Sequence, residues 1–133
     1  MGNASLYHLQ LNVSPAGLLF YRAFFAELGY RISEESDQHL AASDGQVDFW
    51  VIETDPAHAH RPYHRKGTGI NHLSFRLSSR AEVDDFVRNF LTPRGITPLY
   101  DSPKVYPEYA ADYYAVYFED PDRIKLEVMA LVR

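Results

Sequence analysis

Cysteine is absent from this chain of 133 residues. Without thiols the protein has no disulfide, no thiolate nucleophile and no cysteine-bound zinc. A chain that needs no disulfide fits a reducing compartment, and we expect a cytoplasmic protein.

Long apolar segments and excess positive charge are missing as well. No run reaches the ~20 apolar residues of a membrane span, and the N-terminus lacks the basic and apolar regions of a signal peptide. The 13 Lys and Arg residues are outnumbered by 18 Asp and Glu residues, which gives a net charge of −5. Glycine-rich phosphate loops and nucleophile elbows are not found either. These absences predict a protein that binds neither nucleic acid nor a membrane.

The chain does contain one strand pattern written twice. "YHLQLNVSP" spans residues 7–15 and "NHLSFRLSS" spans residues 71–79, with His8 and His72 at the same place in the pattern. Apolar and polar residues alternate in both segments, as in a strand with one buried face. The apolar residues face one way and the two histidines face the other way.

A helix and three strands are predicted after each of these segments. Ser14 and Ser79 are suitable N-caps, and Gly29 and Gly95 are suitable ends for the two helices. The expected strands then cover residues 30–35, 39–42 and 47–53 in the first half and 97–100, 113–118 and 124–130 in the second. The sequence thus predicts a single α+β domain of two βαβββ modules, with module one at 1–54, a linker at 55–69 and module two at 70–133.

The two histidine faces suggest a common concavity. Each apolar face should lie under its own helix, so the helices are expected on the outside and the histidine faces on the inside of a cupped mixed sheet. Glu127 lies in "IKLEVMA" (124–130), where alternation places it on the polar face of the last strand. Two imidazoles and one carboxylate suit a divalent Zn, Ni, Mn, Co or Fe ion and leave coordination positions open for substrate. We therefore predict metal ligands at His8, His72 and Glu127.

With these segments the chain resembles the vicinal oxygen chelate superfamily, which includes glyoxalase I, bleomycin and fosfomycin resistance proteins and extradiol dioxygenases. The resemblance rests on "YHLQLNVS", "GINHLSF" and "YYAVYFEDPDRIKLEVM" and covers nearly the whole chain. It implies paired βαβββ modules around a divalent metal, with ligands at His8, His72 and Glu127. Glycine is common in the family where Arg123 stands. The resemblance also implies a homodimer, and the modules can pair within one chain or across two chains.

A fourth site residue is less well defined by the pattern. Glyoxalase I adds a glutamate or glutamine from the first module, for which Glu53 is the candidate when counted back from His72. Counting forward from the preceding hairpin gives Phe49 instead, and four residues along a strand span ~13 Å. Glu53 is therefore a fourth ligand, a catalytic base or neither, and we keep it as the candidate catalytic residue.

Two other groups of side chains have a structural and a functional interpretation. His58, His60 and His64 lie in a polar segment that is more typical of a solvated loop than of a preorganised metal site. A tyrosine-rich segment at 105–114 either packs in the usual way or lines the trough; its members are Tyr106, Tyr109, Tyr113 and Tyr114.

Three functions follow from the resemblance. The first is a metal-dependent glyoxalase-like lyase or isomerase, which acts on a small substrate chelated through vicinal oxygens. The second is a drug- or small-molecule-binding resistance-type protein without catalysis, and the third is a ring-cleaving dioxygenase. The histidine and carboxylate pattern favours an enzyme over a binding protein, and the room for only two modules places the dioxygenase last.

Overall fold

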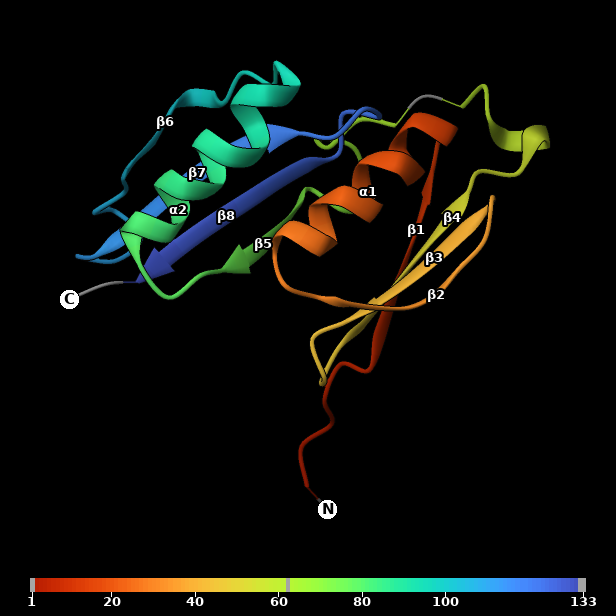
Figure 1. Ribbon diagram of the computed structural model, residues 1–133, viewed down its shortest axis with the longest axis horizontal. Coiled ribbons are helices and arrows are strands. Elements are labelled where there is room, and N and C mark those ends of the chain that lie inside the picture. The colour runs from red at the N-terminus through yellow and green to blue at the C-terminus, as the bar shows by residue number, and fades with distance from the viewer. Residues whose placement is uncertain (1, 62, 132–133) are drawn as a thin grey trace. The chain divides into compact units, whose positions relative to one another are not determined.

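The computed structural model describes residues 2–61 and 63–131 and divides the chain into two compact units, residues 1–62 and 63–133. Each unit contains one four-stranded mixed sheet with a helical segment packed against it (Figure 1). The order of elements is βαβββ in both units, so the predicted α+β class and the two modules are confirmed. The cupped arrangement of the two sheets stays a prediction.

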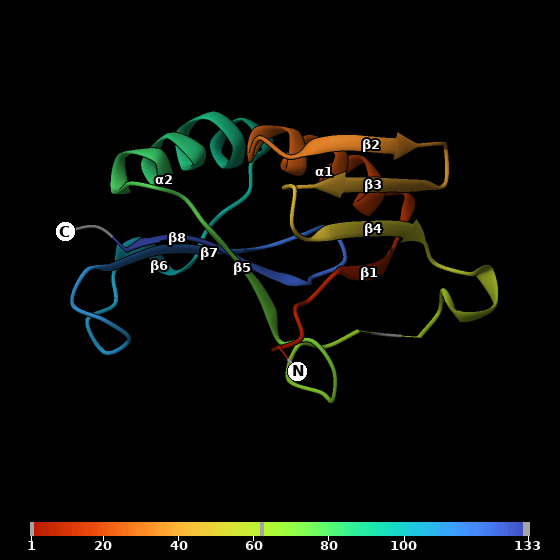
Figure 2. The ribbon, with the colours of Figure 1, turned by 90° about the horizontal axis from the view of Figure 1, so that it is seen from below.

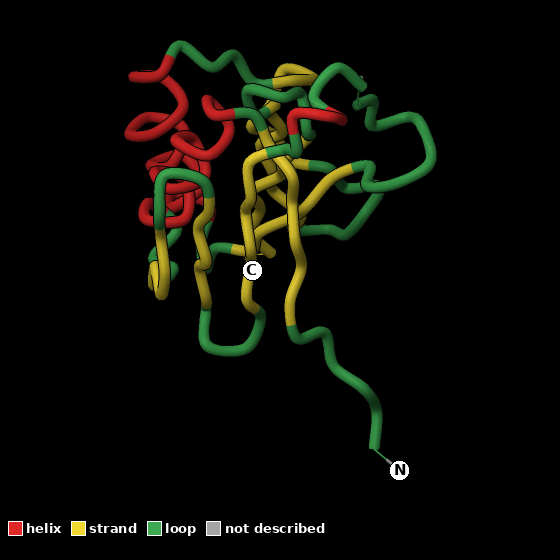
Figure 3. Tube along the Cα trace, turned by 90° about the vertical axis from the view of Figure 1, so that its right-hand side faces the viewer, coloured by secondary structure: helices red, strands yellow, loops and turns green. Residues whose placement is uncertain are grey.

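The first unit is formed by β1 (His8–Val13), α1 (Pro15–Glu27), β2 (Arg31–Glu35), β3 (His39–Ser43) and β4 (Asp48–Glu53). The sheet order is β1-β4-β3-β2, with β1 parallel to β4 and the other neighbours antiparallel. A short 3-10 turn, η1 (Pro56–His58), follows the sheet. Residues 2–7 precede β1 without regular secondary structure (Figure 3). Tyr7 was expected on the buried face of the strand, but it lies outside β1 and is 70% exposed.

The helix α1 begins and ends where its capping residues predict. The Ser14 hydroxyl accepts a hydrogen bond from the Gly17 N–H at 3.1 Å, and Gly29 has the left-handed φ of 81° that suits a residue just after a helix. One face of α1 is buried against the sheet, where the Phe25 and Phe49 ring centroids are 5.2 Å apart. The opposite face of this sheet carries His8.

The second unit is formed by β5 (His72–Arg76), α2 (Arg80–Phe86), β6 (Leu99–Val105), β7 (Tyr113–Glu119) and β8 (Lys125–Leu131). The sheet order is β5-β8-β7-β6, and only β5 and β8 are parallel. The topology repeats that of the first unit. The helix α2 packs on one face of β7 and β8 (Figure 2), with Phe86 and Phe118 centroids 5.5 Å apart.

The helical segment of this unit is less regular than predicted. α2 is followed by a π-helical turn, η2 (Val87–Leu91), and a 3-10 turn, η3 (Thr92–Arg94), which ends at Gly95 with φ of 67°. Pro93 has no N–H to donate, so the regular α-helical hydrogen bonds cannot continue through it. The buried side chains Phe86 and Phe90 stack within this segment, so its apolar face is kept.

The strand β6 extends five residues beyond the predicted end at Tyr100. Tyr100 and Asp101 have left-handed φ values of 61° and 56°, and the pairing with β7 shifts between Leu99 and Lys104. This irregularity interrupts the alternation by which a strand is found in a sequence. None of the helices in residues 2–61 and 63–131 has the length and apolar content needed to cross a membrane.

Candidate metal and substrate site

His72 and Glu127 meet on the face of the second sheet that points away from α2. β5 and β8 pair in parallel, with His72 opposite Lys125 and Ser74 opposite Glu127. His72 Nε2 lies 3.2 Å from Glu127 Oε1, and Glu127 is only 1% exposed. The structure therefore brings two of the three predicted metal ligands together.

The Glu127 carboxylate is held on its other oxygen by Tyr113. The Tyr113 hydroxyl donates a hydrogen bond to Oε2, while Oε1 is turned toward His72. Burial, and then this bond to the carboxylate, raises the pKa of Tyr113 to about 12. Since a buried carboxylate is costly unless it has hydrogen-bond partners, the Tyr113 bond offsets part of the cost of burying Glu127 and keeps Oε1 directed toward His72.

The His72 ring is oriented by Asn71. Asn71 Nδ2 donates to the Arg65 carbonyl oxygen at 3.2 Å, so Asn71 Oδ1 is the atom that faces His72 Nδ1 at 2.8 Å. An amide oxygen accepts only, so the Nδ1 atom carries the proton. Nε2 is then left to bind a proton or a cation in front of the carboxylate. A hydrogen-bond acceptor at the ring nitrogen that does not bind the metal fixes the tautomer in this way, and such an acceptor is typical of metal-binding histidines.

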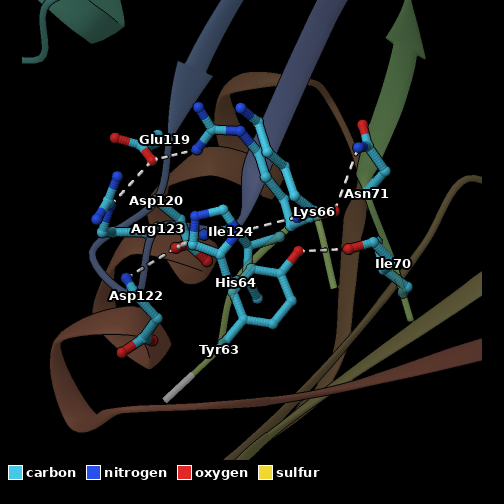
Figure 4. Close-up of polar contacts among 11 residues, drawn as sticks. Tyr63, His64, Lys66, Ile70, Asn71, Glu119, Asp120, Asp122, Arg123 and Ile124 are labelled. Carbon is cyan, nitrogen blue, oxygen red and sulfur yellow. Dashed lines mark hydrogen bonds and ion pairs between the residues drawn. The ribbon is translucent and has the colours of Figure 1, made fainter. Parts of the chain in front are cut away.

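The segment that supplies Asn71 is anchored to the turn between β7 and β8 (Figure 4). Arg65 and Arg123 both bind Glu119, at 2.6 and 3.2 Å, and Tyr63 donates to the Ile70 carbonyl. Arg123 has a φ of 67°, the left-handed conformation that glycine adopts most readily. The position therefore favours glycine, and Arg123 adopts this conformation with its guanidinium bound to Glu119.

An open cleft of about 540 Å³ extends from this pair across the same face of the sheet. Five of its lining side chains are tyrosines; the full set is His72, Tyr100, Tyr106, Tyr109, Tyr113, Tyr117, Lys125 and Glu127. The tyrosine rings contact one another in series, with centroid separations of 5.4–5.7 Å. Burial and the neighbouring Glu127 charge raise the pKa of Tyr117. These rings form an aromatic wall beside the histidine and the carboxylate.

The lining of the cleft also includes a lysine. Lys125 Nζ lies 4.9 Å from the Tyr100 ring centroid and 5.0 Å from that of Tyr117. A hydrogen bond from Lys125 lowers the pKa of Tyr100, and the Arg65 guanidinium adds to the effect. Tyr106, which is 6% exposed, has a hydroxyl with no hydrogen-bond partner in the described part of the chain.

In the first unit, His8 lies exposed on β1 on the face opposite α1, as predicted. Its partner on β4 is Asp48, and the residue two positions further along β4 is Trp50. Glu127 lies two positions beyond the partner of His72, so Trp50, and neither Phe49 nor Glu53, occupies the equivalent position.

Glu53 is the last residue of β4 and pairs with Val13. Alternation along β4 gives it the face of Phe49 and Val51, which are buried toward α1, whereas His8 points the other way. This placement does not support a role for Glu53 beside His8, and its assignment as a base or ligand stays a prediction.

The remaining histidines have other partners or lie exposed. His39 stacks on Trp50 and bonds to Ser36 and Glu34, and His64 Nδ1 accepts the Lys66 N–H at 3.1 Å (Figure 4). No group of three His, Asp or Glu side chains that could hold a metal ion is found within residues 2–61 and 63–131.

Sequence reasoning missed several residues of the site and misplaced one. Tyr114 bonds to Asp84 at 2.7 Å and does not line the cleft, whereas Tyr117 and Lys125 do. The alternation of "IKLEVMA" already places Lys125 on the face of Glu127, and that signal was available. Asn71 had no comparable signal, because its role depends on the carbonyl of Arg65.

The protein is a duplicated βαβββ protein, and its second module carries a histidine and a glutamate on one sheet face. The chain is 32% identical over 128 residues to the uncharacterized protein YqjT of Bacillus subtilis (strain 168), covering 94% of this chain and 98% of that protein. The crystal structure of a candidate glyoxalase from Bacillus halodurans is 31% identical, with a TM-score of 0.84 and 94% of each chain covered. Lactoylglutathione lyase from Agrobacterium tumefaciens shares the fold at 20% identity, with a TM-score of 0.64 and coverage of 98% and 96%.

No protein-family model matches the chain. The similarity in sequence and structure over nearly the full length nevertheless shows the family, and the chain belongs to the vicinal oxygen chelate superfamily of glyoxalases, bleomycin resistance proteins and dioxygenases.

Proposed function

We propose that this protein is a divalent-metal-dependent, glyoxalase-like lyase or isomerase that acts on a small substrate chelated through vicinal oxygens. The proposed metal ligands are His8, His72 and Glu127. His8 would come from the first unit of the same chain or of a second chain in a homodimer.

The observation that carries the proposal is the geometry of His72 and Glu127. His72 Nε2 faces Glu127 Oε1 across 3.2 Å, and with the Nδ1 proton directed to Asn71 the Nε2 atom of a neutral ring presents a lone pair to the carboxylate. Two acceptors at this distance repel each other unless a proton or a cation neutralises them. Nitrogen and carboxylate oxygen suit Zn, Ni, Mn, Co and Fe, so the residues fit the implied metal.

The protein's own residues would bind and orient the substrate. When bound, the metal would supply Lewis-acid polarisation of the two substrate oxygens. Asn71 holds the His72 ring, and Tyr113 holds the carboxylate of Glu127. The tyrosine wall would exclude water from the substrate, which strengthens the electrostatic interactions within the cleft.

Elemental analysis of the purified protein tests the metal directly. We expect one divalent ion per site in the wild type and its loss in His72→Ala, Glu127→Ala and His8→Ala. His64→Ala is the matched control, because this exposed histidine bonds only to its own loop. Wild-type protein that stays metal-free after loading with each of the five metals would overturn the metal proposal.

Turnover of the adduct of methylglyoxal with glutathione tests the activity. Activity that is lost on chelation and restored by metal supports a glyoxalase-like enzyme. Light scattering of the same samples tests the homodimer, whose expected mass is twice that of the 15.3 kDa chain.

The tyrosine wall favours one alternative function, a binding protein without catalysis. Aromatic rings bind flat ligands whether or not a metal is present. Tight ligand binding that a chelator does not change, together with no turnover, would select this alternative.

A further inference from the structure

We propose that the substrate of this cleft is a flat aromatic anion, with its negative group bound at Lys125 and its ring against the tyrosine wall. This inference names the substrate class for the proposed function and rests on it only for the reaction, since the binding itself requires no metal.

The charge of Lys125 is the first argument. The carboxylate directly across the strands is Glu119, which is already bound by Arg65 and Arg123 at 2.6 and 3.2 Å. The other carboxylate of the cleft, Glu127, is bound by Tyr113 and faces His72. Lys125 makes no ion pair within residues 2–61 and 63–131, so its charge in the cleft is available to an anion.

The surroundings of Lys125 strengthen its attraction for an anion. Its ammonium group lies over the rings of Tyr100 and Tyr117, which take the place of water and so lower the local dielectric constant. The sequence as a whole is acidic, with a net charge of −5. A basic group in the cleft of an acidic protein favours anionic over neutral ligands at that place.

The rings are the second argument. Tyr106 and Tyr109 stack with an interplanar angle of 17°, while Tyr117 stands edge-on to Tyr106 at 84°. Such walls present both ring faces and ring edges, which match the offset-stacked and edge-to-face geometries preferred by aromatic pairs. Tyr109 is 63% exposed, which is a large apolar surface for a side chain at the mouth of a cleft. A flat aromatic ligand would cover it.

The spacing of the two polar ends is the third argument. Lys125 and Glu127 are two residues apart on β8 and share a face, so they are separated by ~7 Å along the strand. One substituted six-membered ring spans such a distance. A ligand with its anionic group at Lys125 would thus place the opposite end of its ring beside Glu127 and the Nε2 atom of His72, whose ring reaches toward Glu127 from the position across from Lys125.

Calorimetric titration of metal-free protein tests the proposal with three probes. 4-Hydroxybenzoate carries both features, 4-hydroxybenzamide lacks the charge, and cyclohexanecarboxylate lacks the flat ring. We expect 4-hydroxybenzoate to bind at least about tenfold more tightly than either of the others, since a charged hydrogen bond and a ring contact each contribute about this factor. Equal affinities for all three probes would overturn the proposal. So would a dissociation constant for 4-hydroxybenzoate above about 10 mM.

Variants assign the binding to Lys125. Lys125→Gln should lower the affinity for 4-hydroxybenzoate by about tenfold and leave the affinity for 4-hydroxybenzamide unchanged. Lys125→Arg should keep the affinity for 4-hydroxybenzoate within about threefold of wild type. Lys104→Gln is the matched control, because Lys104 also lies over a tyrosine ring, that of Tyr106 at 5.4 Å, but does not line the cleft. An equal loss in Lys104→Gln and Lys125→Gln, with circular dichroism unchanged, would contradict the assignment.

The two proposals fail in different measurements. If the proposed metal-dependent function is wrong, the protein will not hold a metal ion, yet the binding of 4-hydroxybenzoate will still depend on Lys125. If the substrate class is wrong, metal binding will persist while Lys125→Gln leaves the affinity for 4-hydroxybenzoate unchanged.

Discussion

Asn71→Ala removes one amide that would act on the proposed metal site through the His72 ring. In the wild type, Asn71 Oδ1 accepts from His72 Nδ1 at 2.8 Å, and Asn71 Nδ2 donates to the Arg65 carbonyl at 3.2 Å. With alanine at this position the ring can turn, and Nε2 can carry the proton. The first change turns the Nε2 lone pair away from the proposed metal position, and the second occupies that lone pair with a proton.

The expected magnitude follows from the role of such partners. Loss of an outer hydrogen-bond partner of a metal-binding histidine costs 10–100-fold in affinity, which is about 1.4–2.7 kcal/mol. Asn71→Asp gives the opposite expectation for the same position, since a carboxylate still accepts the Nδ1 proton and makes the imidazole a stronger ligand. Its cost is the lost bond to the Arg65 carbonyl, so we expect the affinity to remain within about threefold of wild type.

Competition with a chromophoric chelator measures the affinity, and long-range ¹H–¹⁵N spectra of the imidazole measure the tautomer in the metal-free protein. At a pH at which the ring is neutral, we expect the Nδ1-protonated form in the wild type and in Asn71→Asp, and a mixture of tautomers in Asn71→Ala. If Asn71→Ala binds metal as tightly as wild type while its tautomer has changed, the reasoning from ring orientation to metal affinity is refuted.

Two further predictions concern the tyrosines. Tyr106→Phe should leave the free energy of unfolding unchanged or raise it by about 1 kcal/mol, because it removes a buried hydroxyl without a partner; a loss of more than about 1 kcal/mol in urea unfolding would reveal a hydrogen bond at that hydroxyl. Burial and hydrogen bonds to acids raise the pKa values of Tyr113 and Tyr114 to about 12. Between about pH 10 and about pH 12 the folded state therefore keeps protons that the unfolded state has lost, and the free energy of unfolding should fall as the pH rises through this range. Tyr114→Phe should make this decline shallower, and an unchanged slope of the urea midpoint against pH would contradict the assignment.

Local patterns in the sequence were sufficient to predict the modules. Ser14 and Ser79 cap the two helices as expected, and alternation in the first strands separates the face of Leu11 from that of His8. Alternation likewise places Glu127 on the polar face of β8 although the residue is buried. These features depend on neighbours within a few residues, so a single sequence contains them.

The features that the sequence did not predict depend on pairing between strands. Counting from the hairpin or from His72 led to Phe49 or Glu53, whereas the register of β1 against β4 gives Trp50. The register is set by which side chains pack across the sheet, and an offset of one residue turns every side chain to the other face. In β6, two residues with left-handed φ interrupt the alternation, so the sequence predicted a strand that ends at Tyr100. The pairing with β7 shows that the strand continues to Val105.

The residue at one equivalent position of the two sheets explains why the proposed function would belong to the duplicated chain and to neither unit alone. Two positions beyond the partner of the histidine, the second unit has the carboxylate of Glu127 and the first unit has the indole of Trp50. Trp50 stacks on His39, so this position of the first unit has an aromatic side chain where the second has the carboxylate proposed as a ligand. One unit thus supplies a histidine and the other supplies a histidine with a carboxylate. A catalytic metal needs three protein ligands with open positions for substrate, so the proposed site requires one unit of each kind, and separate expression of residues 63–133 should yield the cleft without the metal.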